Sequence, residues 1–482
     1  MKLPNCCSAL TPVLLLGACS SAHFGGVQPA RVWSSDNRVV LSDFSVVEAV
    51  AASSWFVFAA TTHGLLVYDR VAHRFRLPVT TIDGYPSRRV RRAFADPSSN
   101  AVWLDLGPGL GYVRYDVDGR TWTPGSLPPE VSGQVLTVEA ALAAAPLADA
   151  MRAAILTDRR LRTSEFTAAA ATPDRPEIFF GTNGLGLVRV DKQTGEWEVL
   201  TYGLLAPSVG AVASTVGGVW AATNAAPGRA QRRGFTWVAR DLSETRTAEG
   251  GRAALGFSFN FARQLLFDGS LLWLASEQGV LRVDTTGFNS RQWDLPNATC
   301  LARSRRGVWV GTTRGLSLIT TAEGVQELGP AGIAVTSLLA TGDTLWVGTN
   351  MGLMQLLPGA TALSRPPEFA DRPSLHVTVY ALGNLQDTIV MATETELFWR
   401  DPATRVWASR PLPPALGVPT ALTAALGELW VGGTRGLAQV ELGTGLLHVH
   451  RVPFDIPAAV RDLTSDRDYL WAATDSGLVR IQ

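Results

Sequence analysis

The feature that most constrains the fold of this sequence is a short string that recurs along most of its length. The clearest copies read Trp-Val-Gly-x-x-x-Gly-Leu and begin at Trp309, Trp346 and Trp430. Copies that begin at Trp273 and Trp471 keep the aromatic residue and the glycine six positions later. Weaker copies place other residues in the aromatic position: Phe58, Trp103, Phe179, Trp220 and Val390. Copies spaced about 40 residues apart identify a repeat protein.

Each copy lies within a series of short apolar runs that predicts β-strands. In one unit, residues 335–340, 345–348 and 353–357 are three such runs. Gly352 precedes the third run and allows the positive φ that a tight turn needs. A small antiparallel sheet with apolar residues on both faces must stack against neighbours on both sides. The sequence therefore predicts an all-β fold, a β-propeller of about ten four-stranded antiparallel blades, with eight to ten as the range.

The tryptophans mark the predicted core between the blades. Seven of them occupy the aromatic position of the repeat: Trp103, Trp220, Trp273, Trp309, Trp346, Trp430 and Trp471. A row of tryptophans could also form a platform on which sugar rings stack. One indole per blade at a fixed position favours packing between sheets instead, so we interpret these seven as structural core residues.

The string Trp-Val-Gly-Thr-x-x-Gly-Leu resembles the propeller repeat of the two-component-regulator type, which occurs in periplasmic sensor regions of bacterial hybrid histidine kinases. The resemblance covers about residues 44–482. It implies the propeller fold and says little about function. The usual companions of this repeat, a membrane span, a kinase and an immunoglobulin-like module, are not evident in the sequence.

The ends of the repeat region predict how the propeller closes. The last unit lacks a fourth strand, while a strand-like segment at 31–41 precedes the first unit. We expect this segment to complete the last blade, which hides two sheet edges. The simplest plan is a single propeller over 31–482, and two five-bladed rings are the alternative. An alanine-rich stretch with apolar residues three to four apart predicts a small helical insertion at about 131–160.

The N-terminus has the pattern of an export signal. Lys2 precedes an apolar run at 9–16, and Leu-Gly-Ala comes directly before Cys19. This pattern describes a secretory leader, and it resembles a bacterial lipobox in which Cys19 becomes lipidated. We therefore predict a lipoprotein signal peptide at 1–18 and a tether at 19–30, with a plain secretory leader as the alternative. The predicted location is the cell envelope, lipid-anchored on the outer membrane and facing the periplasm or the exterior.

Charge and composition exclude several classes of protein. The 482 residues carry 42 basic and 42 acidic groups, whereas a general nucleic-acid binder has a basic excess. Hydrophobic residues make up 46% of the chain, which indicates a folded protein. A membrane-spanning helix needs about 18 or more consecutive apolar residues, and the sequence has no such run. We therefore expect contact with the membrane through the N-terminal lipid only.

No constellation of residues predicts catalysis or metal binding. His448 and His450 alternate on a predicted strand, as a metal pair would need, but no third ligand is evident near them. The sequence also has no phosphate-binding glycine loop and no nucleophile elbow. We therefore assign no catalytic residue, no metal and no cofactor, and we expect the protein not to be an enzyme.

Clusters of arginines are the surface feature that points to binding. The candidates are Arg88, Arg89, Arg91, Arg92, Arg232, Arg233, Arg303, Arg305 and Arg306. If they lie in turns that lead into first strands, they gather on one face of the ring. Guanidinium groups there could bind phosphates or a carboxylate-rich protein. The alternative is that they are solvated and balanced by nearby acidic residues.

These features favour a non-enzymatic extracytoplasmic lipoprotein that binds an envelope protein or complex, or serves as its scaffold. The first alternative is a free-standing sensor propeller for an acidic or glycan ligand. The second alternative is a propeller lyase or glycosidase.

Overall fold

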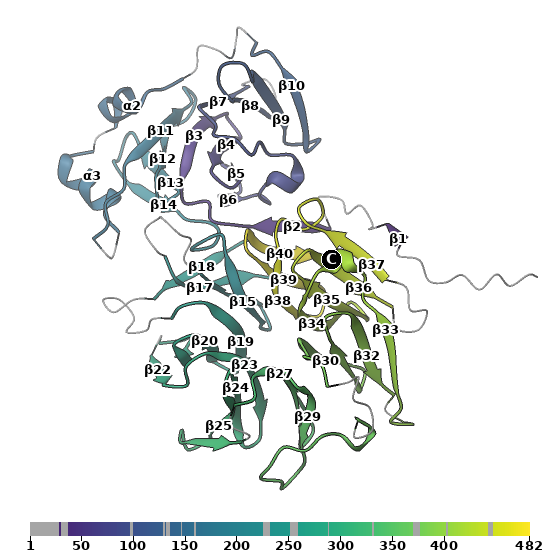
Figure 1. Ribbon diagram of the computed structural model, residues 1–482. Coiled ribbons are helices and arrows are strands. Elements are labelled where there is room, and N and C mark those ends of the chain that lie inside the picture. The colour runs from purple at the N-terminus through teal and green to yellow at the C-terminus, as the bar shows by residue number, and fades with distance from the viewer. Residues whose placement is uncertain are drawn as a thin grey trace, which may run out of the picture.

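The computed structural model of the chain describes residues 28–29, 37–96, 100–128, 131, 135–145, 147–158, 161–224, 232–250, 259–287, 289–329, 332–369, 376–401, 403–441 and 447–482. These residues form ten β-sheets (Figure 1). We call the sheets blades 1 to 10, in the chain order of their first strands. The predicted all-β fold with ten blades is confirmed.

The first three blades have four strands each. Blade 1 contains β3 (Val47–Ala52), β4 (Phe56–Thr61), β5 (Leu65–Asp69) and β6 (Arg74–Phe75). Blade 2 contains β7 (Arg92–Ala95), β8 (Ala101–Asp105), β9 (Tyr112–Asp116) and β10 (Thr121–Gly125). Blade 3 contains β11 (Phe166–Ala171), β12 (Glu177–Thr182), β13 (Leu187–Asp191) and β14 (Trp197–Leu200).

The next four blades follow the same plan until blade 7, which has three strands. Blade 4 contains β15 (Val209–Ser214), β16 (Gly218–Thr223), β17 (Gly234–Ala239) and β18 (Thr245–Glu249). Blade 5 contains β19 (Ala262–Asp268), β20 (Leu271–Ser276), β21 (Gly279–Asp284) and β22 (Ser290–Trp293). Blade 6 contains β23 (Ala298–Ser304), β24 (Gly307–Thr312), β25 (Gly315–Thr320) and β26 (Val325–Leu328). Blade 7 contains β27 (Val335–Thr341), β28 (Thr344–Thr349) and β29 (Gly352–Leu356).

The last three blades bring the chain back to its beginning. Blade 8 contains β30 (Ala381–Leu385), β31 (Thr388–Ala392), β32 (Glu396–Arg400) and β33 (Trp407–Pro411). Blade 9 contains β34 (Pro419–Ala425), β35 (Glu428–Gly433), β36 (Gly436–Val440) and β37 (Leu447–Arg451). Blade 10 contains β38 (Val460–Ser465), β39 (Leu470–Thr474) and β40 (Gly477–Ile481), and its fourth strand is β2 (Arg38–Leu41).

The N-terminal strand completes the last blade, as predicted. β2 pairs antiparallel with β40, from Arg38 opposite Ile481 to Leu41 opposite Leu478. Residues 31–36 of the predicted closing segment lie outside the described residues. A two-residue strand, β1 (Gln28–Pro29), pairs in parallel with β37 of blade 9, so this end of the predicted tether lies against the propeller.

Blades 4 to 10 form a closed ring of seven, in the lower part of Figure 1. The first strands contact one another in chain order: β15, β19, β23, β27, β30, β34 and β38. β38 then contacts β15, and the Val212 N–H donates to the Asp462 carboxylate at 2.9 Å across this closing seam. Burial raises the pKa of Asp462 to about 7.

Blades 1 to 3 form a separate group, in the upper part of Figure 1. β3 of blade 1 contacts β11 of blade 3 on one side and β7 of blade 2 on the other, so the spatial order is 3, 1, 2. The expectation of a single propeller over 31–482 is therefore wrong, and so is the alternative of two five-bladed rings. The repeat defines each blade, but contacts between distant residues decide which blades meet.

The two groups share one hydrophobic core. Phe44 and Tyr202 stack with ring centroids 6.3 Å apart, and they belong to a buried cluster that also holds Leu242 and Trp471 of the ring. The Tyr202 hydroxyl donates to the Leu242 carbonyl at 2.8 Å. This continuous core fixes the position of the three-blade group against blades 4 and 10.

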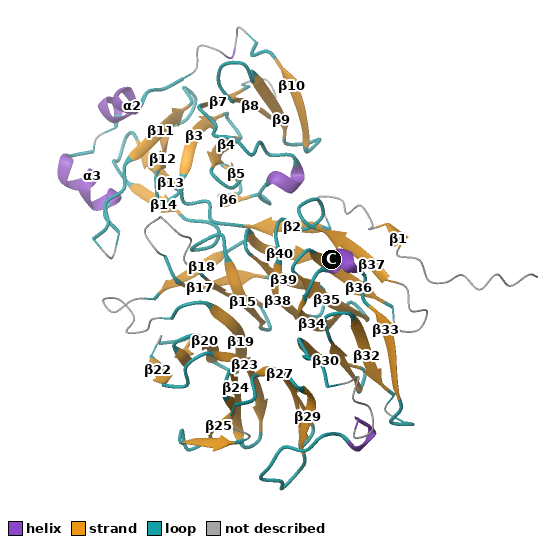
Figure 2. Ribbon diagram, viewed as in Figure 1, coloured by secondary structure: helices purple, strands orange, loops and turns teal. Residues whose placement is uncertain are grey.

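The predicted helical insertion is confirmed between blades 2 and 3 (helices in Figure 2). It contains α2 (Val138–Ala144) and α3 (Asp149–Leu156). Ala141 and Ile155 of these helices belong to one buried cluster with Ile178 and Phe180 of blade 3. The insertion therefore covers a flank of blade 3 that no other blade covers.

Side chains of the first strands bind the backbone of the following blade. The Thr299 hydroxyl donates to the Val335 carbonyl at 2.6 Å, and the Thr420 hydroxyl donates to the Val460 carbonyl at 2.9 Å. We call these contacts inter-blade links. The first glycine of the repeat string lies against the valine that accepts this hydrogen bond. At Gly432, a Cβ would lie 2.6 Å from Cγ1 of Val460, so only a glycine leaves enough space.

The rest of the repeat closes a turn and fills the space between sheets. The Thr349 hydroxyl donates to the Gly352 carbonyl at 2.7 Å, and Gly352 has a φ of 104°. Six of the seven tryptophans in the aromatic position are at most 8% exposed: Trp220, Trp273, Trp309, Trp346, Trp430 and Trp471. Trp103 of blade 2 is half-buried.

Truncation of a repeat tryptophan should cost much stability. Trp346 is 3% exposed and its indole N–H donates to the Thr341 hydroxyl at 3.0 Å. Trp346→Ala should destabilise the fold by about 3–5 kcal/mol. Trp197, 41% exposed on β14, provides a control, and Trp197→Ala should cost less than about 1 kcal/mol. Thermal unfolding measures both, and equal midpoints for the two variants would contradict the core role of Trp346.

A single methyl group at the first glycine of the repeat should also be harmful. Gly432→Ala places a Cβ against Val460, so we expect a loss of about 1–3 kcal/mol, as for an overpacked core. At Gly217, an exposed turn, the nearest atom to a new Cβ is 3.8 Å away. Gly217→Ala should therefore leave the unfolding midpoint unchanged. If both variants unfold like wild type, this glycine is not required for blade packing.

Candidate binding site

One flank of blade 2 lacks the neighbour that a propeller blade normally has. The strand register identifies the side chains on this flank, because residues paired across neighbouring strands lie on the same face of the sheet. Between β7 and β8, Arg92 pairs with Asp105 and Phe94 with Trp103. Between β8 and β9, Trp103 pairs with Arg114 and Asp105 with Tyr112. We call these six residues the open flank. The opposite face of the same sheet packs on blade 1 through side chains such as Val102 and Leu104.

No other described strand or helix makes extensive contacts with this face. Phe94 is nevertheless only 3% exposed and Asp105 6% exposed, while Trp103 and Tyr112 are half-buried. β8 and β9 make extensive contacts only with strands of blade 2. Outside blade 2, β7 makes extensive contacts only with β3 and β4 of blade 1. The corresponding free flank of blade 3 is covered by the helical insertion. Among the described residues, helices therefore cover one end of the three-blade group, and no further blade or helix packs extensively on the other end.

The open flank combines aromatic rings with guanidinium groups. Phe94 and Tyr112 meet edge to face, with centroids 6.2 Å apart. The Arg92 guanidinium lies 5.9 Å from the centre of the Phe94 ring and pairs with Asp105 at 3.1 Å. The buried indole nitrogen of Trp103 has no hydrogen-bond partner among the described residues. Aromatic and arginine side chains of this kind are enriched at protein–protein contacts.

Four of the nine predicted binding arginines lie at the edge of this flank. Arg88, Arg89, Arg91 and Arg92 are exposed, in the segment that leads into β7 and at its first residue. Their side chains add positive charge beside the aromatic residues. Sequence reasoning identified these arginines but missed Phe94, Trp103 and Tyr112 as a surface, because they look like ordinary blade residues.

The other five arginines do not join them, so the expected single basic face is wrong. Arg303, Arg305 and Arg306 lie at the end of β23 and in the turn to β24, after the first strand of blade 6 and not before it. Arg303 pairs there with Asp268 at 2.9 Å. Arg232 and Arg233 precede β17 of blade 4 and form hydrogen bonds with nearby segments of the protein. Arg232 donates to the Gly184 carbonyl and Arg233 to the Phe259 carbonyl. The clusters therefore lie in different groups of blades and at different ends of strands.

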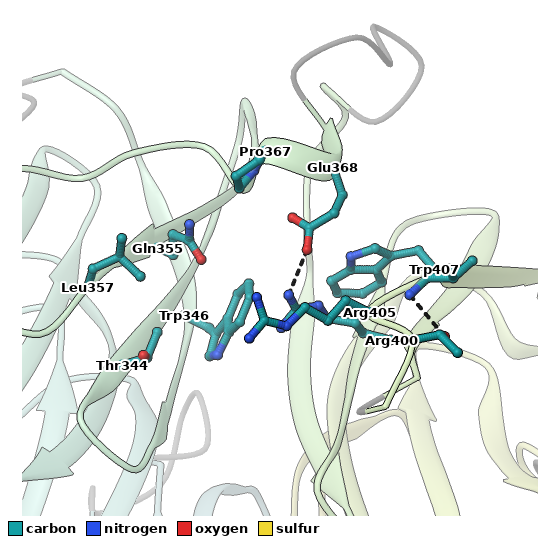
Figure 3. Close-up of a pocket in the computed structure, with 11 residues that line it drawn as sticks. Thr344, Trp346, Gln355, Leu357, Pro367, Glu368, Arg400, Arg405 and Trp407 are labelled. Carbon is teal, nitrogen blue, oxygen red and sulfur yellow. Dashed lines mark hydrogen bonds and ion pairs between the residues drawn. The ribbon is translucent and has the colours of Figure 1, made fainter.

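A cavity of about 740 Å³ lies between blades 7 and 8 (Figure 3). It forms where blade 7 has no fourth strand. After β29 the chain makes a single bridge between Gln355 and Ser364 and then a short 3₁₀ helix, Pro367–Phe369. This path leaves Trp346 and Trp407 beside an opening instead of under a strand.

The polar groups of this cavity are partly paired. Arg400 and Glu368 form an ion pair of 2.6 Å, and the Arg400 guanidinium lies 5.3 Å from the centre of the Trp346 ring (Figure 3). The second carboxylate oxygen of Glu368 and the indole nitrogen of Trp407 are buried without a partner among the described residues. The lining of the cavity therefore holds one acceptor and one donor whose hydrogen bonds are not satisfied by the described residues. Neither Glu368 nor Arg400 stood out in the sequence, although the missing fourth strand after residue 357 was a usable signal.

The remaining sequence candidates do not form a reactive site. His450 is fully buried and stacks on Trp430 at 6.0 Å, and burial lowers its pKa to about 3, so it is a neutral core residue. No group of three or more metal-binding side chains occurs among the described residues. Cys19 lies outside the described residues. The helices of the described part of the chain are too short or too polar to cross a bilayer.

Comparison with known proteins gives similarity at the level of solved structures. No family model and no curated protein matches the sequence. The extracellular domain of a protein described as a hybrid two-component system from B. thetaiotaomicron is 12% identical, with 90% of this chain and 70% of that chain covered and a TM-score of 0.45. A second such domain from B. thetaiotaomicron is 12% identical over 94% of this chain and 83% of that chain, with a TM-score of 0.35. A virginiamycin B lyase from Staphylococcus aureus is 14% identical over 57% of this chain and 94% of that chain, with a TM-score of 0.45.

Proposed function

We propose that this protein is a non-enzymatic binding module of the cell envelope, anchored through lipid at Cys19, and that it holds a partner protein of the envelope on the open flank of blade 2. One observation carries the proposal. A blade face that carries Phe94, Trp103 and Tyr112 has no second blade packed against it among the described residues, and Trp103 and Tyr112 are only half-buried there. Such faces mark sites of protein association.

The chemistry of the flank defines the partner. Arg88, Arg89 and Arg91 are exposed in the segment that leads into β7, and none of them forms an ion pair with another described residue. A partner that presents an apolar patch bordered by carboxylates would complement this surface. The seven-bladed ring behind it supplies a rigid support, because each of its blades is held on both sides.

A photoreactive amino acid in place of Leu110 tests the proposal. Leu110 is 49% exposed in the turn between β8 and β9, beside the open flank. In cells that naturally make the protein, we expect one discrete crosslinked product with an envelope protein. The control is the same substitution at Val325, which is 43% exposed on β26 of the ring.

A charge reversal links the product to the flank. Arg88→Glu with Arg91→Glu should remove the Leu110 product while the unfolding midpoint stays that of wild type. Identical product patterns at Leu110 and Val325 would contradict the proposal. A product with the mass of two copies of this chain would replace the envelope partner with self-association.

A second candidate function, recognition of a glycan, is favoured by the cavity between blades 7 and 8. The free carboxylate oxygen of Glu368 and the free indole N–H of Trp407 match the donor and acceptor of a sugar hydroxyl. In a glycan-array assay, Glu368→Ala should then reduce binding at least tenfold. Glu327→Ala, on the exposed strand β26, is the control. Absence of glycan binding by the wild-type chain, or equal binding by both variants, would rule this candidate out.

A further inference from the structure

A second cavity, of about 530 Å³, lies where the three-blade group meets the ring. From the three-blade group it is lined by residues 74–77, after β5, and by Tyr115 and Arg120 on either side of the β9–β10 turn. From the ring it is lined by residues 241–243 of the β17–β18 turn and by Tyr469 and Arg480 of blade 10. Each group of blades supplies part of the wall. Cavities of this size at the junction of two structural units are typical ligand sites.

The charges that line this cavity are mostly positive. Four arginines line it: Arg74, Arg76, Arg120 and Arg480. Asp241 is the single acidic residue among the lining residues. Its carboxylate already accepts hydrogen bonds from the backbone and hydroxyl of Ser243 at 3.0 and 2.6 Å. The cavity therefore has an excess of positive charge that its own lining does not neutralise.

Arg480 is the least expected of these side chains, because it is only 8% exposed. Its guanidinium donates to the Arg240 carbonyl at 2.8 Å and lies 4.5 Å from the centre of the Tyr469 ring. No carboxylate among the described residues lies within 4.0 Å of its nitrogens. Burial lowers the pKa of Arg480 below its ordinary value. The charges of Asp241 and Asp466 oppose this shift, although neither carboxylate forms an ion pair with Arg480. A buried cation whose charge is only partly compensated is destabilising, and an anion in the adjacent cavity would reduce that cost.

The other arginines of the cavity differ in the ion pairs and hydrogen bonds that they form with neighbouring residues. Arg76 pairs with Asp69 at 3.3 Å and lies 4.4 Å from the centre of the Phe56 ring. Arg74 is exposed, and it forms no ion pair with another described residue. Arg120 is hydrogen-bonded to the Tyr115 hydroxyl, which holds it at the cavity wall. Arg74, Arg120 and Arg480 thus approach the cavity from three separate segments.

The floor of the cavity is fixed by the core that joins the two groups. Phe75 packs on Tyr202, with ring centroids 5.1 Å apart, and Tyr202 binds the Leu242 carbonyl. Phe75, Leu242 and Tyr469 also line the cavity, so apolar surface lies next to the guanidinium groups. A site fixed in advance in this way loses little entropy when a ligand binds.

We propose that this cavity binds a small organic anion, whose carboxylate, sulfate or phosphate group is held by Arg74, Arg120 and Arg480 while its remaining atoms lie against Phe75 and Tyr469. The site is distinct from the open flank and from the cavity between blades 7 and 8, and it does not depend on the proposed function. Because its walls come from both groups of blades, an occupied site also ties the two groups together. Binding should therefore raise the unfolding midpoint of the full chain.

Titration calorimetry and thermal unfolding with defined compounds test this inference. The probes are glucuronate, glucose 6-phosphate and glucose 6-sulfate, with glucose as the neutral control and sodium chloride to keep ionic strength constant. We expect at least one anion to bind with a Kd below about 1 mM and to raise the unfolding midpoint, and glucose to do neither. The three anions distinguish a carboxylate from a phosphate or sulfate ligand.

Substitutions of the lining assign the binding to this cavity. Arg74→Gln and Arg120→Gln should each weaken binding about tenfold or more, since each removes a charge-assisted contact. Arg314→Gln, an exposed position on the ring, should bind like wild type. Arg480→Gln should abolish binding, and Arg74→Gln keeps the test valid if that buried substitution prevents folding. The inference is overturned if no anion binds below about 10 mM, or if Arg74→Gln and Arg120→Gln both bind as tightly as wild type.

Discussion

The whole architecture depends on one contact, the link from the first strand of a blade to the backbone of the blade beside it. Thr299 and Thr420 make it within the ring, and Thr167 of blade 3 makes it to the Val47 carbonyl of blade 1 at 2.7 Å. The glycine that admits the neighbouring valine recurs with it, since a Cβ at Gly181 would lie 2.6 Å from Cγ1 of Val47. Because the link involves two blades at a time, it does not specify how many blades form a ring.

This local character explains what could be predicted from the sequence. The repeat located all ten blades, and the unmatched strands at the two ends identified the pairing of β2 with β40. The alanine-rich spacing identified α2 and α3. The division into seven and three could not be predicted, because Val47 begins blade 1 with the same residue type that Val335 and Val460 provide in the ring. The sequence around Val47 does not show that its inter-blade link comes from blade 3.

The candidate sites were harder to predict for the same reason. Trp103 has the repeat position of Trp309, but Trp309 is 2% exposed and packs with Val335 of the next blade, whereas Trp103 is half-buried. The arginines of the junction cavity come from three separate segments, so they form no cluster in the sequence. Both surfaces are products of the seven-bladed closure. It leaves three blades outside the ring, with one end that no further blade packs against and one arginine-lined boundary against blades 4 and 10.

The pairing of β2 with β40 has a consequence for how the molecule is made. β2 lies far from β40 in the sequence, and their pairing places Arg38 opposite Ile481. Blades 4 to 10 close their ring through β38 and β15, but blade 10 gains its fourth strand only after β40 has been made. Such a long-range contact forms late and slowly. Once formed, it gives β40 a partner on both sides, so this strand cannot separate from the sheet without breaking its pairing with β2.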